Sequence, residues 1–178
     1  MIVSNVFNKL PESFSEEKQY GVQDTKLIGL YNKKRLERYI DKEFVQPNAY
    51  LDNYNVALPK SNNNGFFGET LTNPFIIGPN VGVTDTFISI GQLHTINEAK
   101  ALLKFIKTKF LRALLGIHKV TQDNPKGVWQ EVPIQDFTQN SDIDWSQSIP
   151  EIDQQLYKKY GLTDDEINFI ETKVQAMD

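Results

Sequence analysis

The sequence predicts an α+β fold in which short, mostly antiparallel strands pack on one long amphipathic helix, with a helical C-terminal tail. Apolar residues recur every three or four positions over residues 95–120, which is the period of a helix with one buried face. Several short runs of branched and aromatic residues, separated by Asn, Gly and Pro, have the composition of strands. Two helix-capping patterns follow residue 147. We therefore expect a domain over residues 1–140 and a tail over residues 141–178 that packs on that domain or on a partner domain.

Six short runs are predicted to be strands. They are Lys26–Tyr31, Leu36–Ile40, Tyr54–Leu58, Phe75–Ile77, Thr86–Ile90 and Val128–Val132. The third run ends at Pro59, which favours an edge strand because proline has no N–H to donate to a neighbouring strand. The first two runs are joined by the basic sequence Asn32-Lys33-Lys34-Arg35, which is predicted to form a turn.

The long helix is predicted to begin at Thr95, which with Glu98 fits the capping box. Its buried face is predicted to consist of Ala99, Leu102, Leu103, Ile106, Phe110, Ala113, Leu114 and Ile117. Its other faces carry one acid and a set of cations, which are Lys100, Lys104, Lys107, Lys109, Arg112 and Lys119. Such a helix can pack on its own domain while it faces a polyanion. The alternative is that the lysines only solvate an exposed face.

The tail is predicted to contain two short helices. Ser148 with Glu151, and Thr163 with Glu166, both fit the capping box that begins a helix. Gly161 is suited to end the first of the two, because glycine adopts the left-handed conformation without steric cost.

Charge is unevenly distributed along a chain whose net charge is -4. Residues 136–178 hold ten acids and three bases, so residues 1–135 hold thirteen acids and sixteen bases. A basic working surface on the main domain is therefore compatible with the acidic total. The chain has no cysteine, no apolar run near the roughly 20 residues that span a bilayer, and no signal-peptide pattern at its start. We expect a cytoplasmic protein that does not contact a membrane.

The sequence predicts no catalytic residue and no metal site. The two histidines, His94 and His118, lack the companion spacing of a metal site. Residues Thr72–Phe75 lack the second proline of an amino-methyltransferase motif, and they are interpreted as a turn that leads into a strand. The charged cluster over residues 11–18 is too short and irregular to hold the carboxylates of a metal-dependent nuclease.

Polar loops supply the residue types that read DNA bases. Asn and Gln can hydrogen-bond the edge of adenine, and Arg the edge of guanine. The candidates for base reading are Arg35, Asn62, Asn63, Asn64 and Gln122. The alternative is that these residues are ordinary loop residues, because loops favour Asn and Gly for conformational reasons.

Four segments carry a likeness to a known family. They are Phe105–Arg112 (FIKTKFLR), Lys119–Gln122 (KVTQ), Val132–Thr138 (VPIQDFT) and Leu156–Thr163 (LYKKYGLT). These segments resemble the C-terminal region of adenine-specific DNA methyltransferases of restriction-modification systems, including combined type II restriction-modification enzymes. The resemblance extends from about Thr70 to the end, and Asn5–Leu10 resembles the usual beginning of that region.

The resemblance implies a target-recognition domain that reads a DNA sequence. The expected partners are double-stranded DNA and the methyltransferase and nuclease domains of the same system. No position matches the family's cofactor loop or catalytic tetrapeptide, so S-adenosylmethionine and Mg²⁺ are expected only in the catalytic domains that this chain would accompany. Contacts to phosphates would fix the register of the protein on DNA. The candidates for these backbone contacts are Lys107, Lys109, Arg112 and Lys119.

Two other functions stay open from the sequence. In the first, the chain itself methylates or cuts DNA. In the second, the chain is a protein-interaction module without DNA contact, and the basic helix is buried against an acidic partner.

Overall fold

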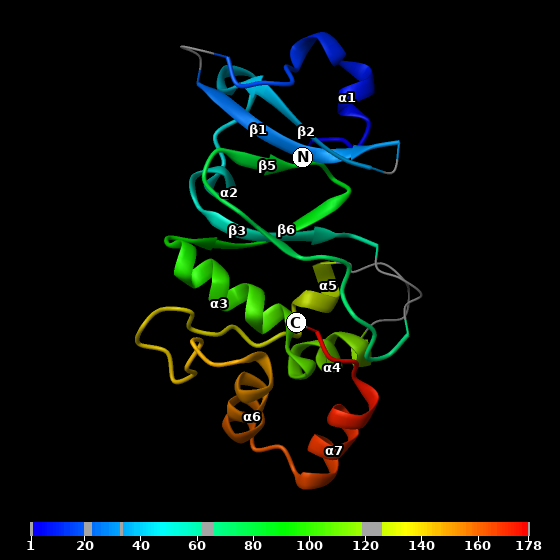
Figure 1. The fold of residues 1–178 in the computed structure, drawn as a ribbon, viewed down its shortest axis with the longest axis vertical. Coiled ribbons are helices and arrows are strands. Elements are labelled where there is room, and N and C mark those ends of the chain that lie inside the picture. The colour runs from blue at the N-terminus through cyan, green and yellow to red at the C-terminus, as the bar shows by residue number, and fades with distance from the viewer. Residues whose placement is uncertain (1, 20–22, 33, 62–65, 119–125, 178) are drawn as a thin grey trace. The chain divides into compact units, whose positions relative to one another are not determined.

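The computed structural model describes residues 2–19, 23–32, 34–61, 66–118 and 126–177 (Figure 1). The chain divides into two compact units. Unit 1 comprises Met1–Lys60 and Phe75–Ile96, and unit 2 comprises Ser61–Pro74 and Asn97–Asp178. This division does not coincide with the predicted boundary at residue 140. Long-range backbone contacts account for the difference, since the Gly68 carbonyl accepts the N–H of Gln175 at 2.9 Å and joins the segment before residue 75 to the C-terminus.

Unit 1 contains two three-stranded sheets, which confirms the α+β class. In one sheet, β1 (Asp24–Tyr31) lies between β2 (Lys34–Asp41), which is antiparallel to it, and β5 (Val81–Val83), which is parallel. In the other, β3 (Tyr54–Pro59) lies between β4 (Phe75–Ile77) and β6 (Phe87–Leu93), both antiparallel to it. The prediction of an edge strand before Pro59 is wrong, because Pro59 is the last residue of a central strand and costs the sheet little there.

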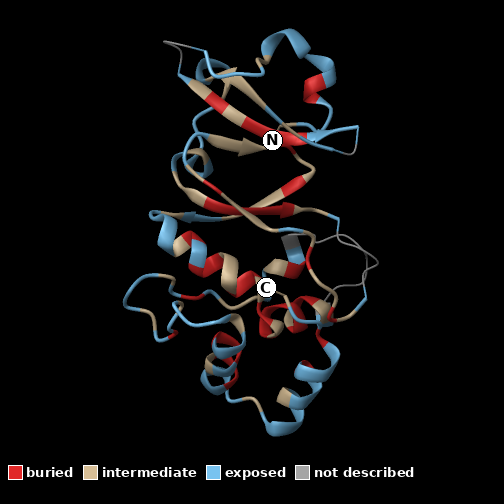
Figure 2. Ribbon diagram, in the orientation of Figure 1, coloured by how far each residue is buried: buried red, intermediate tan, exposed pale blue. Residues whose placement is uncertain are grey.

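Strand β1 is buried on both faces, which explains its apolar composition. Successive side chains of a strand point to opposite faces. Leu27 packs with Val6 and Phe7 of the N-terminal segment, whereas Ile28 packs with Ala57 and Ile77. Figure 2 shows this burial along β1 and β3. The short elements of unit 1 are α1 (Val6–Lys9), α2 (Ala49–Asp52) and two 3₁₀ turns at Pro11–Ser13 and Lys42–Phe44.

Unit 2 is helical, and its first two helices replace the single long helix that the sequence predicts. Helix α3 (Ile96–Lys107) ends and α4 (Lys109–His118) begins at Thr108. The Thr108 hydroxyl donates to the Phe105 carbonyl at 2.6 Å and accepts the N–H of Leu111 at 3.2 Å. Thr108 therefore acts as an N-cap for α4 in the middle of an unbroken apolar period.

The break at Thr108 changes which residues are buried. Leu111 and Leu115 of α4 are buried although the single-helix pattern left them off the apolar face. Ile117 was predicted to be buried, yet its side chain is 67% exposed. The period of 3.6 residues cannot continue in register through a residue that starts a new helix.

The remaining elements of unit 2 are α5 (Lys126–Trp129), α6 (Ile149–Tyr160) and α7 (Asp164–Lys173). The predicted strand at Val128–Val132 is wrong: these residues end a helical turn, in which the N–H of Val132 bonds to the Trp129 carbonyl at 3.2 Å. Both predicted capping boxes are confirmed, at Ser148 and at Thr163. Gly161 ends α6 in the left-handed conformation with φ of 65°, as predicted.

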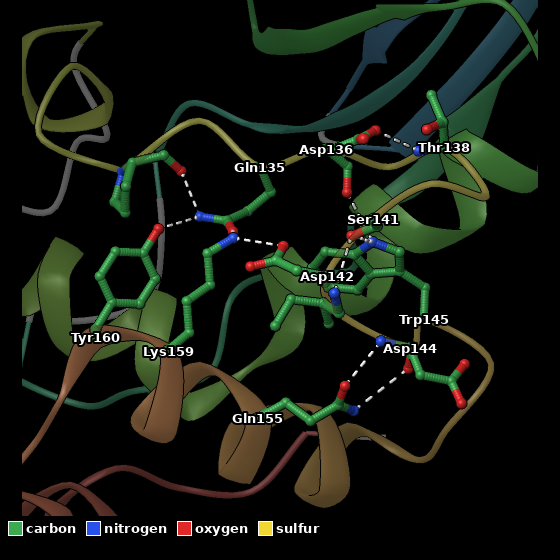
Figure 3. Close-up of polar contacts among 12 residues, drawn as sticks. Gln135, Asp136, Thr138, Ser141, Asp142, Asp144, Trp145, Gln155, Lys159 and Tyr160 are labelled. Carbon is green, nitrogen blue, oxygen red and sulfur yellow. Dashed lines mark hydrogen bonds and ion pairs between the residues drawn. The ribbon is translucent and has the colours of Figure 1, made fainter.

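Polar contacts hold the long loop between α5 and α6 on α6 (Figure 3). The Gln135 side chain donates to the Tyr160 hydroxyl at 2.7 Å and accepts from the Lys159 ammonium at 3.0 Å. Lys159 also forms an ion pair with Asp142 at 2.7 Å. The Trp145 ring packs against Phe105 and Phe137 of the same unit, while its N–H donates to the Asp136 carbonyl. The loop is thus fixed by side chains from α3 and α6.

Candidate nucleic-acid interface

Lys104 of α3 and Lys109 of α4 are bound within unit 2. The ammonium of Lys104 donates to three successive carbonyls, those of Trp145, Ser146 and Gln147, at 2.9, 3.1 and 2.7 Å. The ammonium of Lys109 forms an ion pair with the Glu171 carboxylate at 2.6 Å and also donates to the Glu171 carbonyl at 3.0 Å. The sequence suggested that these lysines face outward, either toward a polyanion or into water. In the structure, Lys104 and Lys109 instead bind groups of the same unit.

Arg112 is buried, with 2% of its surface exposed. Its guanidinium donates to four backbone carbonyls, which belong to Lys107, Thr108, Glu69 and Gln175. Because the Arg112 guanidinium is buried and its N–H donors are bonded to these carbonyls, it has no access to a DNA phosphate. We therefore withdraw Arg112 as a backbone contact, and Lys109 with it, because the Lys109 ammonium is already paired with a carboxylate.

An acidic group beside Arg112 completes the capping of α4. The Asp153 carboxylate of α6 accepts the N–H groups of Lys109 and Phe110 at 3.0 and 2.8 Å. Burial raises the pKa of Asp153 to about 6, although these two hydrogen bonds oppose the shift. Burial also lowers the pKa of Arg112 to about 10 and raises the pKa of Tyr157. These shifts come from a structural network that joins α4, α6 and α7.

The other predicted contact residues divide into two groups. Lys107 is half-buried and also interacts within the molecule. Five candidates lie outside the described residues, namely Asn62, Asn63, Asn64, Lys119 and Gln122. Of the predicted base-reading residues, Arg35 is therefore the one that the structure describes.

Arg35 lies near the free end of the hairpin formed by β1 and β2. The register pairs Tyr31 with Lys34 and Leu30 with Arg35, so residues 32 and 33 connect the strands. Asn32 takes φ of 48°, a left-handed value that Asn tolerates in hairpin turns. We call Tyr31, Asn32, Lys34 and Arg35 the hairpin end; all four residues are exposed.

The guanidinium of Arg35 lies over aromatic rings. Its Cζ atom lies 4.0 Å from the centroid of the Phe75 ring and 5.9 Å from that of the Phe87 ring. The two rings meet edge to face with centroids 5.8 Å apart. Among the described residues, no acceptor receives a hydrogen bond from the Arg35 guanidinium. The cation–π contact uses the charge of the group, and its N–H donors remain available for a ligand.

Ion pairs neutralise the neighbouring cations of the hairpin. Lys26 pairs with Glu37 at 2.9 Å, and this hydrogen-bonded carboxylate raises the pKa of Lys26. Arg38 pairs with Glu16 at 2.7 Å. In the described part of the chain, Lys34 and Arg35 have no acidic partner. The positive charge of the hairpin is therefore concentrated at its end.

The two units also differ in charge. Unit 1 contains nine Lys or Arg and nine Asp or Glu, whereas unit 2 contains ten and fourteen. The acidic balance that the sequence places in the tail thus belongs to the whole of unit 2, which includes the helices once considered cationic. Unit 1 has equal numbers of acids and bases, whereas unit 2 is acidic, so unit 1 repels a polyanion less than unit 2 does.

Sequence reasoning missed the role of Phe75 and Phe87, which it treated only as strand residues. Each lies far from Arg35 in the sequence. The pairing of β4 and β6 with β3 brings the two rings together, and Arg35 of the other sheet lies over them. The sequence signal for this site was the run of basic residues at the start of β2, where Lys34 and Arg35 are adjacent and exposed.

The comparisons with known proteins identify no relative: no protein-family model, no curated protein and no solved structure matches the chain. Across the described ranges, no group of three or more His, Asp or Glu side chains could hold a metal ion. No helix in those ranges is long and apolar enough to cross a membrane.

Proposed function

We propose that this chain recognises double-stranded DNA as the target-recognition part of a restriction-modification adenine methyltransferase or type II restriction enzyme, and that the hairpin end of unit 1 makes the contact. The observation that carries the proposal is the pair of adjacent exposed cations, Lys34 and Arg35, at the end of a two-stranded ribbon. The major groove of B-DNA admits a two-stranded ribbon, and phosphates attract its cations.

The residues that carry the family resemblance support a structural role for unit 2 and a DNA contact in unit 1. Phe105 packs on Phe137 with ring centroids 5.9 Å apart, and Phe110 stacks on Tyr160 at 4.9 Å. Gln135 bonds to the same tyrosine. Three of the four resembling segments thus meet inside unit 2, and the fourth lies outside the described residues. The resemblance rests on residues that pack with one another, so the DNA contact is better sought in unit 1.

A salt titration tests the proposal with a matched pair of variants. Each phosphate contact releases counterions, so its loss lowers the slope of log affinity against log salt by about one unit. We expect Lys34→Gln to lower the slope by about this amount on labelled duplexes of mixed sequence. Lys100→Gln, which removes an exposed lysine from α3 in unit 2, is expected to leave the slope unchanged.

Three results would contradict the proposal. The full chain could fail to bind any duplex at low salt, which would favour the protein-interaction module. The two lysine variants could lower the slope equally, which would remove the hairpin end as the contact. Methyl transfer or cleavage by the full chain, supplied with S-adenosylmethionine and Mg²⁺, would instead show an enzyme.

A further inference from the structure

We infer that Arg35 reads a guanine, with Phe75 and Phe87 as positioning residues that hold its guanidinium in place. This inference rests on the proposed DNA recognition and adds to it a base and a site. The three residues come from β2, β4 and β6, all within unit 1. Strand β2 belongs to one sheet of unit 1, and β4 and β6 belong to the other, so the site forms where side chains of the two sheets meet.

The first step concerns orientation. An arginine on a solvent-exposed strand ordinarily samples many rotamers, and ordering it costs conformational free energy. The Arg35 Cζ atom lies over the Phe75 ring, 4.0 Å from its centroid, and this contact restricts the rotamers of Arg35. Phe75 is half-buried and packs against the cluster of Ile28, Ala57 and Ile77. The ring is therefore held by the core, and a ligand would meet an arginine that is already ordered.

The second step concerns hydrogen-bonding capacity. The five N–H donors of a guanidinium lie in its plane as a fork, and no acceptor among the described residues receives a hydrogen bond from the Arg35 fork. Nearby acids do not use that fork, because Glu37 pairs with Lys26 and Glu16 pairs with Arg38. The site thus presents a planar fork of donors that lacks an acceptor among the described residues.

The third step concerns the ligand. In the major groove, guanine presents two adjacent acceptors, O6 and N7, which match the two parallel donors of the fork. Adenine places a donor beside its N7, and cytosine presents a donor, so each would oppose an N–H of the fork. A phosphate can also accept two donors from this fork, but Lys34 beside the site can hold a phosphate by charge alone. The planar fork of Arg35 is thus matched to the two acceptors of guanine.

The test combines a protein change with a base change. Duplexes selected by the full chain from a random pool are expected to share at least one guanine. Replacing that guanine by 7-deazaguanine removes the N7 acceptor and is expected to weaken wild-type binding roughly tenfold. Arg35→Lys keeps the charge but replaces the planar fork by a single ammonium, so its binding should respond less to this base change than wild-type binding does. Its discrimination against the other base pairs should fall roughly 5- to 150-fold.

Two further variants separate positioning from packing. Phe75→Leu keeps an apolar side chain but removes the ring, so it is expected to lower the guanine preference while the salt slope stays unchanged. Phe75→Tyr keeps the ring and is expected to retain the preference. Should Phe75→Leu prove unfolded by circular dichroism, the Arg35→Lys cycle still decides the matter.

The outcomes distinguish this inference from the proposed function. If wild-type chain binds DNA but Arg35→Lys responds to 7-deazaguanine as the wild type does, the guanine contact is wrong and DNA recognition stands. A loss of affinity in Arg35→Lys that is equal on all sequences would make Arg35 a phosphate contact and also overturn the inference. If the wild-type chain binds no DNA, both fail together.

Discussion

Replacing Arg112 by methionine is expected to lower the free energy of unfolding by about 3–5 kcal/mol, the range typical of breaking a buried charged network. The substitution roughly preserves side-chain volume but removes every donor. Four backbone carbonyls, including those of Glu69 and Gln175, would lose their bond to this side chain. Asp153 would also lose the nearby positive charge that favours its ionised form.

Urea unfolding followed by circular dichroism measures this effect. Lys100→Met is the matched control, because it makes the same kind of change at an exposed position of α3 and is expected to stay within about 0.5 kcal/mol of the wild type. A loss below about 1 kcal/mol in Arg112→Met would mean that the buried guanidinium does not hold the segment before residue 75 and the C-terminus to α4.

Stability is expected to fall between about pH 4 and pH 6 because of Asp153. Its pKa is about 6 in the folded protein, above the ordinary value of 3.8, so the folded state binds the proton more tightly. The stability that this proton supplies is fully present below about pH 4 and is lost as the pH rises through 6. Two pKa units correspond to a loss of up to about 3 kcal/mol.

The comparison with Asp153→Asn isolates this contribution, because asparagine cannot titrate. The difference in unfolding free energy between wild type and variant should change by up to about 3 kcal/mol from pH 4 to pH 7. The exposed acids Asp136, Asp144, Glu151 and Glu166 have pKa values lowered by their hydrogen bonds, and they act in the opposite direction at lower pH. They are common to both proteins and cancel in the difference. A difference that does not vary with pH would show that Asp153 is ionised throughout this range.

Local sequence was sufficient for features whose partners lie within a few residues. The capping boxes at Ser148 and Thr163 form between residues three apart, and both are present. Gly161 ends α6 in the left-handed conformation, and this preference is a property of the glycine itself that needs no distant partner. Five of the six predicted strands are strands for a similar reason, since short branched and aromatic runs between turns suit a pleated backbone in many contexts.

The break between α3 and α4 could not be read from the apolar period alone. Thr108 can sit in a helix or cap one, and the choice depends on Asp153, whose carboxylate receives the N–H groups of residues more than forty positions away. The same holds for the cations of these helices. The acceptors of Lys104 are 41 to 43 residues distant, and Arg112 reaches a carbonyl 63 residues away. A helical wheel therefore predicts that Lys104 and Arg112 are exposed, whereas in the structure distant carbonyls accept their hydrogen bonds.

The sequence by itself determined the α+β class, the positions of most strands, the capped helices of the C-terminal region and the basic turn before β2. These depend on propensity, period and contacts between near neighbours. Only the tertiary structure decided which cations remain available to a ligand. It placed carbonyls and carboxylates around Lys104, Lys109 and Arg112, and it placed the Phe75 ring beneath Arg35. The availability of a charged group is set by whatever the chain brings to it from a distance, and no local pattern of residues records that.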